Sequence, residues 1–426
     1  MILKRNRRAY LIITALLSMY FGWSQNRDFA QQTIETLCSD SFAGRGYIDK
    51  GDNKAANYIA NQFKTIGLKP FGSNYFQPFT LGVNTIENAK VSLDGIELKP
   101  GYDFLTSPGS ASASINAPIY YISQKKLESN KGAKLVSKAI SKGCVPVLDQ
   151  FDVKNELAKK NLQAIYANPQ LKNLAFLKPS MLWSVARNQS SHCELWLVDS
   201  IFNRKTDSIT INVKAEFIKN YQSQNVIGLV PGKEFPDSVV IFCGHYDHLG
   251  KMGDAIFYGA NDNASGIAML LDMAKYFVEN PQKYSIVFIA FAAEEAGLVG
   301  SKFYVDNPPI NLPLSKTKFV FNMDLMGNGE AGATVVNGSV FTEQFNLLTK
   351  INSENKYLPV VKTRGKAANS DHYFFTEAGI PSFFMYTMGD YTYYHIPNDN
   401  AENLHLGPYY DKTFLLIRDF IIAINQ

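Results

Sequence analysis

Five short segments carry carboxylate and imidazole side chains in the second half of this 426-residue chain. No thiolate accompanies them, and nitrogen and carboxylate ligands without thiolate are typical of a catalytic zinc site. Such segments, dispersed along a chain, predict one metal site assembled by the fold. Their residues are His245 with Asp247 and His248, Asp262, Glu294 with Glu295, Asp324, and Tyr394 with His395.

Apolar runs of strand length come immediately before three of these segments. Val239 to Cys243 leads into His245, Ser285 to Phe291 leads into Glu294, and Phe319 to Phe321 leads into Asp324. Continuous apolar runs rich in β-branched and aromatic residues are typical of parallel strands buried on both faces. Ligands bind at the carboxyl ends of such strands, so we expect the three segments to meet in one crevice.

Helical patterns alternate with these strands. Residues 264–277 have apolar positions at helical spacing, and so do residues 52–66, where Asp52 can cap the start and Gly67 suits the end. Leu415 to Ile422 predicts a last helix. The alternation predicts a three-layer α/β sandwich around a mixed, largely parallel sheet. Residues 83–220 carry no acidic or histidine cluster, and we interpret them as a smaller inserted α+β domain between two catalytic segments, 25–82 and 221–426.

The amino-terminal 24 residues have the layout of a secretory signal peptide, with four basic residues before an apolar run. Cleavage after Ser24 removes those four charges from a formal charge of +4 and leaves the remainder close to neutral. We therefore expect an exported protein, periplasmic or extracellular, without a nucleic-acid or membrane surface. An uncleaved anchor is the alternative, although about 15 apolar residues are few for a membrane span. The four cysteines have no metal-type spacing, and a Cys144–Cys193 pair stays open.

Each candidate ligand also has an ordinary structural interpretation. Asp262 lies between two asparagines, where a turn before a helix is the simple explanation. Asp247 follows His245 by two residues, so its carboxylate can accept the second imidazole hydrogen bond and fix the tautomer. His248 faces another way and is interpreted as a loop residue near the site. Adjacent carboxylates such as Glu294 and Glu295 repel one another unless positive charge lies nearby.

The charge sum of the candidate ligands favours two zinc ions. Asp262, Glu295 and Asp324 bring three negative charges, and His245 and His395 bring none. Two Zn²⁺ ions leave a residual charge of +1, which lowers the pKa of a bridging water toward neutral. Cobalt and manganese remain alternatives.

In these motifs the sequence resembles the co-catalytic di-zinc aminopeptidases of the MH clan of metallopeptidases, secreted bacterial members included. The matching segments are residues 244–250, 259–266, 293–301, 322–327 and 394–395, together with 39–46 and 225–228. Family members often carry a protease-associated domain where residues 83–220 lie, and these residues fit that module only loosely.

The resemblance implies a role for each residue. His245 and Asp324 would hold one ion, Glu295 and His395 the other, and Asp262 would bridge them. Glu294 would be the general base that takes a proton from the bridging water to form the hydroxide, and Asp247 would orient His245. Tyr394 resembles a tyrosine placed against the developing oxyanion, and ordinary packing is its alternative. The segment 370–372 resembles a recurrent family segment, to which we assign no catalytic role.

The resulting hypothesis is a zinc-dependent aminopeptidase acting on peptides with a free N-terminus. A glutaminyl-peptide cyclotransferase on the same scaffold is the second hypothesis, and a non-catalytic binding protein is the third. The loop before His395 predicts an aromatic substrate pocket, for which packing is the alternative interpretation. Its candidate lining residues are Tyr386, Met388, Tyr391 and Tyr393. Residue specificity and oligomeric state do not follow from the sequence.

Overall fold

Four parallel strands form the centre of the main sheet in the computed structural model, which describes residues 25–152 and 154–426. In spatial order they are β13, β10, β14 and β17. β9 pairs antiparallel with β13 on one side, and β15 pairs antiparallel with β17 on the other, with β16 at that edge. The bounds are Tyr284–Phe291, Phe235–His245, Thr317–Met323 and Ser382–Thr387 for the centre, and Ser208–Val230, Ala333–Val336 and Val361–Arg364 for β9, β15 and β16.

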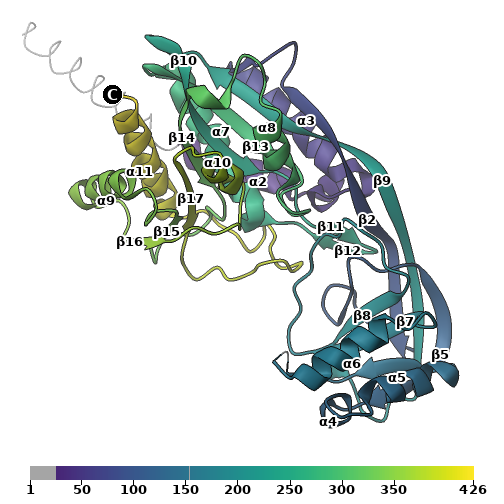
Figure 1. The fold of residues 1–426 in the computed structure, drawn as a ribbon. Coiled ribbons are helices and arrows are strands. Elements are labelled where there is room, and N and C mark those ends of the chain that lie inside the picture. Colours follow the sequence, from purple (N-terminus) through teal and green to yellow (C-terminus); the bar gives the residue numbers. More distant parts are fainter. Residues whose placement is uncertain (1–24, 153) are drawn as a thin grey trace, which may run out of the picture.

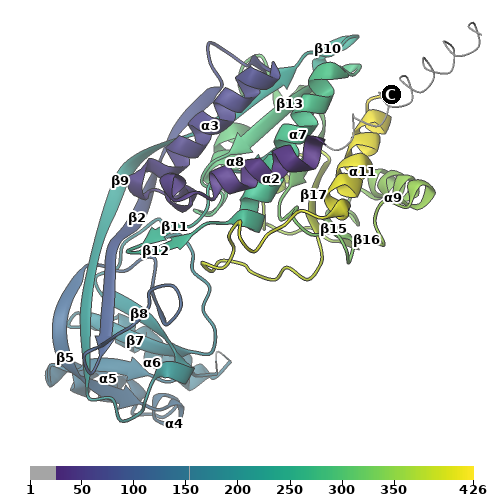
Figure 2. The same ribbon diagram turned by 180° about the vertical axis from the view of Figure 1, so that it is seen from behind.

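Helices cover both faces of this sheet. One face carries α3 (Gly51–Ile66), α7 (Ser265–Glu279) and α11 (Pro408–Ile424), and α2 (Gln25–Leu37) packs on α7. The opposite face carries α8 (Val299–Asp306) and α10 (His372–Glu377), as Figure 1 and, from behind, Figure 2 show. α9 (Thr342–Asn355) lies beside α11. The expected three-layer sandwich with a largely parallel centre is confirmed.

The side chains of each central strand alternate between the two faces. Val240 and Phe242 of β10 contribute to the core beneath α7, whereas Val239 and Ile241 contribute to the core beneath α8 and α10. Both cores exclude water, and this explains why the strand is apolar throughout its buried part. Within the buried part of the strand, the first polar side chain is that of His245, at the carboxyl end.

A smaller lobe lies at the end of a long two-stranded ribbon. β2 (Phe76–Leu93) and β9 pair antiparallel and run from the main sheet into this lobe (Figure 1). The predicted boundaries at residues 83 and 220 thus fall inside continuous strands. The lobe contains β4 (Phe104–Thr106), β5 (Ala113–Ile122), β6 (Val145–Leu148), β7 (Asn173–Lys178), β8 (Cys193–Val198), α4 (Gln124–Leu127), α5 (Gly132–Ser141) and α6 (Glu156–Tyr166).

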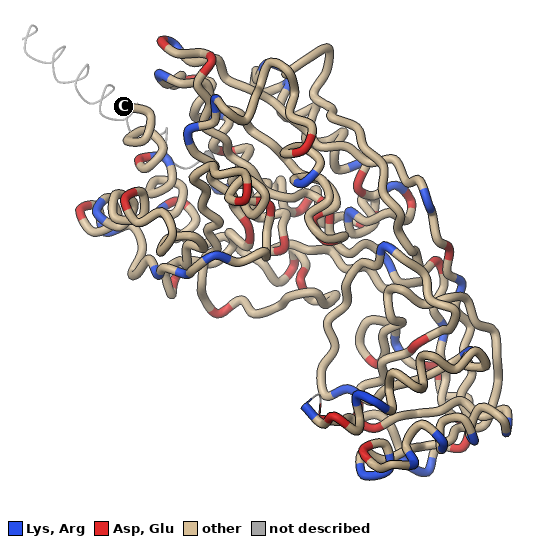
Figure 3. The backbone as a smooth tube through the Cα atoms, in the orientation of Figure 1, with Lys and Arg blue, Asp and Glu red and all other residues tan. Residues whose placement is uncertain are grey.

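The remaining short strands are β1 (Lys69–Pro70), β3 (Ile96–Glu97), β11 (Gly250–Met252) and β12 (Ala255–Phe257). Across residues 25–152 and 154–426, no helix has both the length and the apolar character that a bilayer span requires. The predicted signal peptide, residues 1–24, lies outside the described residues. Acidic residues gather along the backbone near the middle of the larger lobe, and basic residues are frequent along the helices of the smaller lobe (Figure 3).

Two local expectations need correction or completion. The predicted helix at 52–66 is α3, and Gly67 ends it with a left-handed φ of 100°. Asp52, however, does not cap the helix. Its buried carboxylate accepts hydrogen bonds from the hydroxyls of Tyr221 and Ser223, which ties α3 to β9. All four cysteines are free, so the open Cys144–Cys193 pair does not form here.

Candidate metal centre

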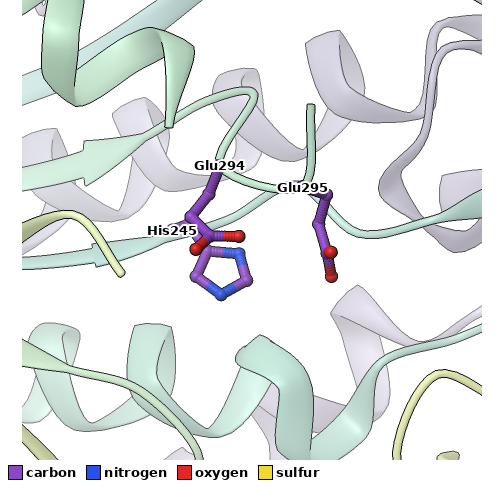
Figure 4. A group of neighbouring side chains, drawn as sticks. All are labelled: His245, Glu294 and Glu295. Carbon is purple, nitrogen blue, oxygen red and sulfur yellow. The ribbon is translucent and has the colours of Figure 1, made fainter. Parts of the chain in front are cut away.

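The register of the central strands brings the first ligand candidates together. Cys243 pairs with Asn322 between β10 and β14, so His245 and Asp324 lie level, two residues further along. Glu294 and Glu295 follow β13 in a loop whose direction is set by Ala293, which has a left-handed φ of 56°. Figure 4 shows both glutamates leaving this loop toward the same side, with the imidazole of His245 beside Glu294. Adjacent carboxylates therefore occupy separate positions along one site.

The side chain of Asp262 lies between two histidines. Oδ1 of Asp262 lies 3.2 Å from Nε2 of His245, which is also 3.4 Å from Oδ1 of Asp324. Oδ2 of Asp262 lies 3.2 Å from Nε2 of His395, which is also 3.3 Å from Oε2 of Glu295. The five residues predicted as ligands thus form two donor groups that share Asp262.

The spacing of these donor atoms is explained better by a bound metal ion than by hydrogen bonds between them. Asp324 Oδ1 and His395 Nε2 are buried and make no hydrogen bond within the part of the chain that the structure describes, despite their close contacts. Ligand atoms about 2.0–2.2 Å from a tetrahedral zinc ion are roughly 3.3–3.6 Å apart. The four contacts around Asp262, at 3.2 to 3.4 Å, are close to that spacing. A carboxylate and imidazole set of this size is suited to zinc.

The site has a strongly negative field. Burial alone would lower the pKa of His395, but Glu295 and Asp262 raise it to about 11. Burial raises the pKa of Glu294 well above its usual range, and the neighbouring carboxylate of Glu295 adds to that effect. Asp262, also buried, keeps a pKa well below its usual range because it contacts His245 and His395. A cation among these side chains is therefore electrostatically favoured.

The carboxylate of Asp247 orients the loop that carries Glu294 and Glu295. It does not orient the imidazole of His245. Nδ1 of His245 lies 3.1 Å from the backbone oxygen of Asp247, whereas the carboxylate Oδ1 is 3.9 Å away. That carboxylate instead accepts hydrogen bonds from the backbone N–H groups of Glu294 and Glu295, at 3.1 and 3.3 Å. The predicted hydrogen bond from His245 to the Asp247 side chain is wrong, because the bend after β10 turns this side chain toward the neighbouring strand end.

His248 belongs to the site, contrary to its interpretation as a loop residue near it. Its side chain is fully buried, and Nδ1 lies 2.8 Å from Oε1 of Glu295. Donor atoms of His248, Asp262 and Glu295 all lie within 4.8 Å of one another. The chain turns sharply after β10, so the strand alternation used in the sequence argument no longer applies at this position.

A network of buried polar groups holds the turn that carries Asp262. Asn263 accepts from the N–H groups of Gly266 and Leu325 and donates to Met323, which joins the Asp262 turn to the Asp324 loop. A side chain at Gly266 would collide with Asn263 and the Met323 backbone. A glycine at position 266 is therefore needed for this close approach.

Two charged residues that the sequence argument did not single out enclose the same turn. Asp399 is fully buried and accepts hydrogen bonds from the N–H groups of Asn261 and Asp262, at 2.8 and 3.1 Å. Arg45, also fully buried, donates to the backbone oxygens of Tyr258 and Gly259 on the other side. No spacing in the sequence points to Asp399 or Arg45, because each contacts backbone groups that are distant in sequence.

The smaller lobe supplies a partner for His395. Nδ1 of His395 lies 2.9 Å from the backbone oxygen of Trp183, and the N–H of Trp183 donates to the oxygen of His395. The indole of Trp183 stacks on Phe257 and donates to the oxygen of Thr106. A hydrogen bond at Nδ1 fixes the tautomer that leaves Nε2 free for a metal.

A pocket of about 230 Å³ opens next to the donor groups. Tyr394 lines it, stacks on the ring of His395, and has a pKa raised by burial and by the nearby carboxylates. Its hydroxyl therefore stays protonated and can donate a hydrogen bond. The pocket is lined by His245, Asp262, Glu294, Glu295, Asp324, Leu325, Arg364, Asn369, Phe384, Tyr386 and Tyr394.

Only one of the four residues expected to form the aromatic pocket wall lines this pocket. That residue is Tyr386. Tyr391 and Tyr393 line a separate cavity of about 490 Å³, and Met388 accepts a hydrogen bond from Thr334. In the loop before His395, Tyr391 and Tyr393 therefore face a different cavity from Tyr386 and Tyr394.

The segment 370–372 positions the side chain of Asp324 through a hydrogen bond. Ser370 donates to Oδ2 of Asp324 at 3.0 Å and accepts from Asn322 at 2.7 Å. Asp371 and His372 are fully buried behind it. Burial raises the pKa of Asp371 to about 7 and lowers that of His372 to about 4.

Comparison with known proteins gives a consistent result. Residues 225–418 match the model of peptidase family M28. The chain is 28% identical over 335 residues to the aminopeptidase YwaD of Bacillus subtilis, and the match covers 73% of this chain and 69% of that protein.

Solved structures share the fold across nearly the whole chain. The zinc aminopeptidase BSAP of Bacillus subtilis superposes with a TM-score of 0.70 at 22% identity, covering 94% of this chain and 96% of that one. A peptidase M28 precursor from Shewanella amazonensis superposes with a TM-score of 0.66 at 17% identity, covering 94% and 97%. The coverage includes the smaller lobe as well as the main sheet.

Proposed function

We propose, from the match of residues 225–418 to the model of peptidase family M28, that this chain is a zinc-dependent aminopeptidase of that family. It is a metallopeptidase that hydrolyses the bond after the N-terminal residue of a peptide. The observation that carries this proposal is the pair of donor groups that share Asp262. Glu294 lines the same pocket but takes no part in the contacts of Asp262 with the two histidines.

We assign two zinc ions to this site. His245 and Asp324 would hold one ion, His395 and Glu295 the other, and Asp262 would contribute one oxygen to each. The separate contacts of Oδ1 and Oδ2 of Asp262 with two different histidines support the number two. The bond of His248 Nδ1 to Glu295 supports a positioning role for His248 in place of a ligand role.

Bound zinc supplies a Lewis acid for the scissile carbonyl and makes water acidic enough to be activated near neutral pH. Glu294 accepts the proton of the attacking water and passes it to the leaving amine. The two hydrogen bonds from the glutamate loop to Asp247 fix the position of this base. The protonated hydroxyl of Tyr394 can donate to the oxygen on which negative charge develops. The free α-amino group of the substrate is attracted by the carboxylates.

Hydrolysis of aminoacyl-anilides tests this proposal. We expect the purified protein to release the anilide group, a chelator to abolish the release, and added Zn²⁺ to restore it. Absence of hydrolysis with zinc, cobalt and manganese would contradict the proposal. A glutamine-headed peptide in the same assay distinguishes hydrolysis from cyclisation, the reaction of the second hypothesis.

We also propose that the protein is exported and that residues 83–220 are an inserted domain at the position of a protease-associated domain. The basic and apolar layout of residues 1–24 supports export, with cleavage after Ser24. Sequencing the N-terminus of protein recovered from cell fractions tests this: a periplasmic or extracellular chain that begins at Gln25 is expected. A cell-associated chain that retains residues 1–24 would show an anchor instead.

A further inference from the structure

The pocket beside the donor groups has charges of opposite sign at different places. Its lining contains four buried or half-buried carboxylates, those of Asp262, Glu294, Glu295 and Asp324, and one exposed guanidinium, that of Arg364. The remaining lining is apolar, aromatic or neutral. A substrate that spans this pocket therefore meets acidic groups at one place and a cation at another.

Arg364 has no ion-pair partner among the residues that the structure describes. It is the last residue of β16, pairs with Val336, and lies level with Phe384 through β15. Lys366, the next cation along the chain, forms an ion pair with Glu377. Arg364 is exposed and forms no ion pair or side-chain hydrogen bond within residues 25–152 and 154–426. Its five N–H donors are available to a ligand.

The chain after Arg364 links it to the donor groups. Residues 365–369 lead to Ser370, whose hydroxyl donates to Asp324. Asn369, in that link, lines the pocket together with Arg364. The carboxamide of Asn369 adds a neutral donor to the same lining. This short connection keeps the cationic side of the pocket close to the site of hydrolysis.

We propose that Arg364 binds a carboxylate of the substrate, which makes the enzyme selective for acidic peptides or for very short ones. This inference rests on the proposed aminopeptidase function. The guanidinium matches a carboxylate in geometry and can form two parallel hydrogen bonds with it. The pocket of about 230 Å³ is smaller than the roughly 300–1,000 Å³ typical of small-molecule sites, so it accommodates a short segment.

Two sources can supply this carboxylate. One is the side chain of an N-terminal Glu or Asp, and the other is the C-terminal carboxylate of a dipeptide. Both place a negative charge a short distance from the reacting amide, while the α-amino group lies among the acidic residues. Substrates that carry the carboxylate at one position only distinguish the two sources.

The test compares kcat/KM for four substrates with zinc-loaded protein. The two acidic ones are glutamyl-anilide and leucyl-leucine, and their uncharged counterparts are glutaminyl-anilide and leucyl-leucinamide. Arg364→Ala should lower the ratio of acidic to uncharged substrate about ten- to hundredfold, as loss of a charge-assisted hydrogen bond does. Lys362→Ala is the matched control, since it removes one positive charge from the same strand at a residue that does not line the pocket.

Each outcome has one meaning. A fall for glutamyl-anilide alone assigns the carboxylate to the N-terminal side chain, and a fall for leucyl-leucine alone assigns it to the C-terminus. Equal effects on acidic and uncharged substrates, or an equal change in Lys362→Ala, overturn the role of Arg364. If the unchanged protein hydrolyses none of the four, the proposed function itself fails. The same comparison can be made without turnover in the Glu294→Gln variant. There, the dissociation constants of leucyl-leucine and of its amide are measured with and without Arg364→Ala.

Discussion

The imidazole of His395 is bonded through Nδ1 to the backbone oxygen of Trp183, at 2.9 Å, and so a candidate zinc ligand is oriented by a residue of the smaller lobe. The loop that carries Trp183 is anchored by the stack of its indole on Phe257 and by its hydrogen bond to Thr106. The smaller lobe therefore reaches the metal centre directly, although it supplies none of the candidate ligands.

Replacement of this anchor should weaken the second zinc ion. Trp183→Ala removes the stack and frees the backbone oxygen that holds His395. Groups that orient metal ligands typically contribute 10- to 100-fold in affinity, so we expect the dissociation constant of the weaker zinc to rise by about that factor. Competition with a chromogenic chelator measures it. Trp196→Ala, in the same lobe but hydrogen-bonded to Glu194, is the control. Equal zinc affinity in the two variants would contradict the role of Trp183.

Glu294→Gln should separate catalysis from metal binding. The substitution removes the proton acceptor and keeps the size of the side chain, so kcat should fall by several orders of magnitude while zinc content stays near two per chain. Glu295→Gln, one residue later, removes a proposed ligand and should lower zinc content. Metal analysis beside steady-state kinetics checks both. Zinc loss in Glu294→Gln together with zinc retention in Glu295→Gln would mean that the two roles are reversed.

His248 offers a test of positioning against ligation. Its Nδ1 contact with Glu295 can be reproduced by the amide nitrogen of asparagine but not by alanine. We expect His248→Ala to weaken zinc binding about 10- to 100-fold and His248→Asn to restore much of the affinity. Absorption spectra of the Co²⁺-substituted variants report the ligand set. A changed spectrum in His248→Asn would identify His248 as a ligand and contradict the assignment of His395.

Asp399 should be needed for the turn that carries Asp262. Its carboxylate accepts two backbone N–H groups and the hydroxyl of Tyr391. Asp399→Asn puts an NH2 donor where one acceptor oxygen was, so one buried hydrogen bond is lost. We expect this loss to lower the free energy of unfolding by about 1–3 kcal/mol and to displace Asp262. We expect lower thermal stability and weaker zinc binding. Tyr391→Phe removes only the hydroxyl and serves as the control. If both variants lose the same stability and keep full zinc affinity, Asp399 acts on the fold alone.

The burial of Asp272 predicts a pH-dependent stability that does not involve the candidate metal ligands. This residue of α7 is buried, and burial raises its pKa to about 8, against about 3.9 in an unfolded chain. The folded state therefore retains a proton that the unfolded state loses, and stability falls as pH rises from about 4 to about 8.

Asp272→Asn removes this titration and keeps an acceptor for the hydroxyl of Tyr410. The stability gained by the variant over the unchanged protein should therefore increase from pH 5 to pH 8 and level off above that. Urea unfolding at several pH values measures it. A gain that is the same at pH 5 and pH 8 would show that Asp272 is ionised throughout this range.

The sequence alone predicted three of the four central strands and the helices α3, α7 and α11, and the resemblance to a known family supplied the five candidate ligands. Apolar runs that end in His245, Glu294 or Asp324 predict buried parallel strands with polar carboxyl ends, and this pattern is local. The helix at Gly51–Ile66 and its glycine terminus were likewise readable from spacing. Such features depend on residues within one or two turns of each other, where the chain itself fixes the geometry.

Only the tertiary structure decided how the site is supported. Bends after β10 and after Thr387 break strand alternation, so His248 enters the site, the Asp247 carboxylate turns to the glutamate loop, and Tyr391 faces a separate cavity. Trp183 and Arg45 act through backbone oxygens and hydrogen bonds to segments distant in sequence. No residue type marks such contacts in a sequence, because any residue has a backbone oxygen. The packing of the strands and of the two lobes decides which backbone oxygen lies next to the site.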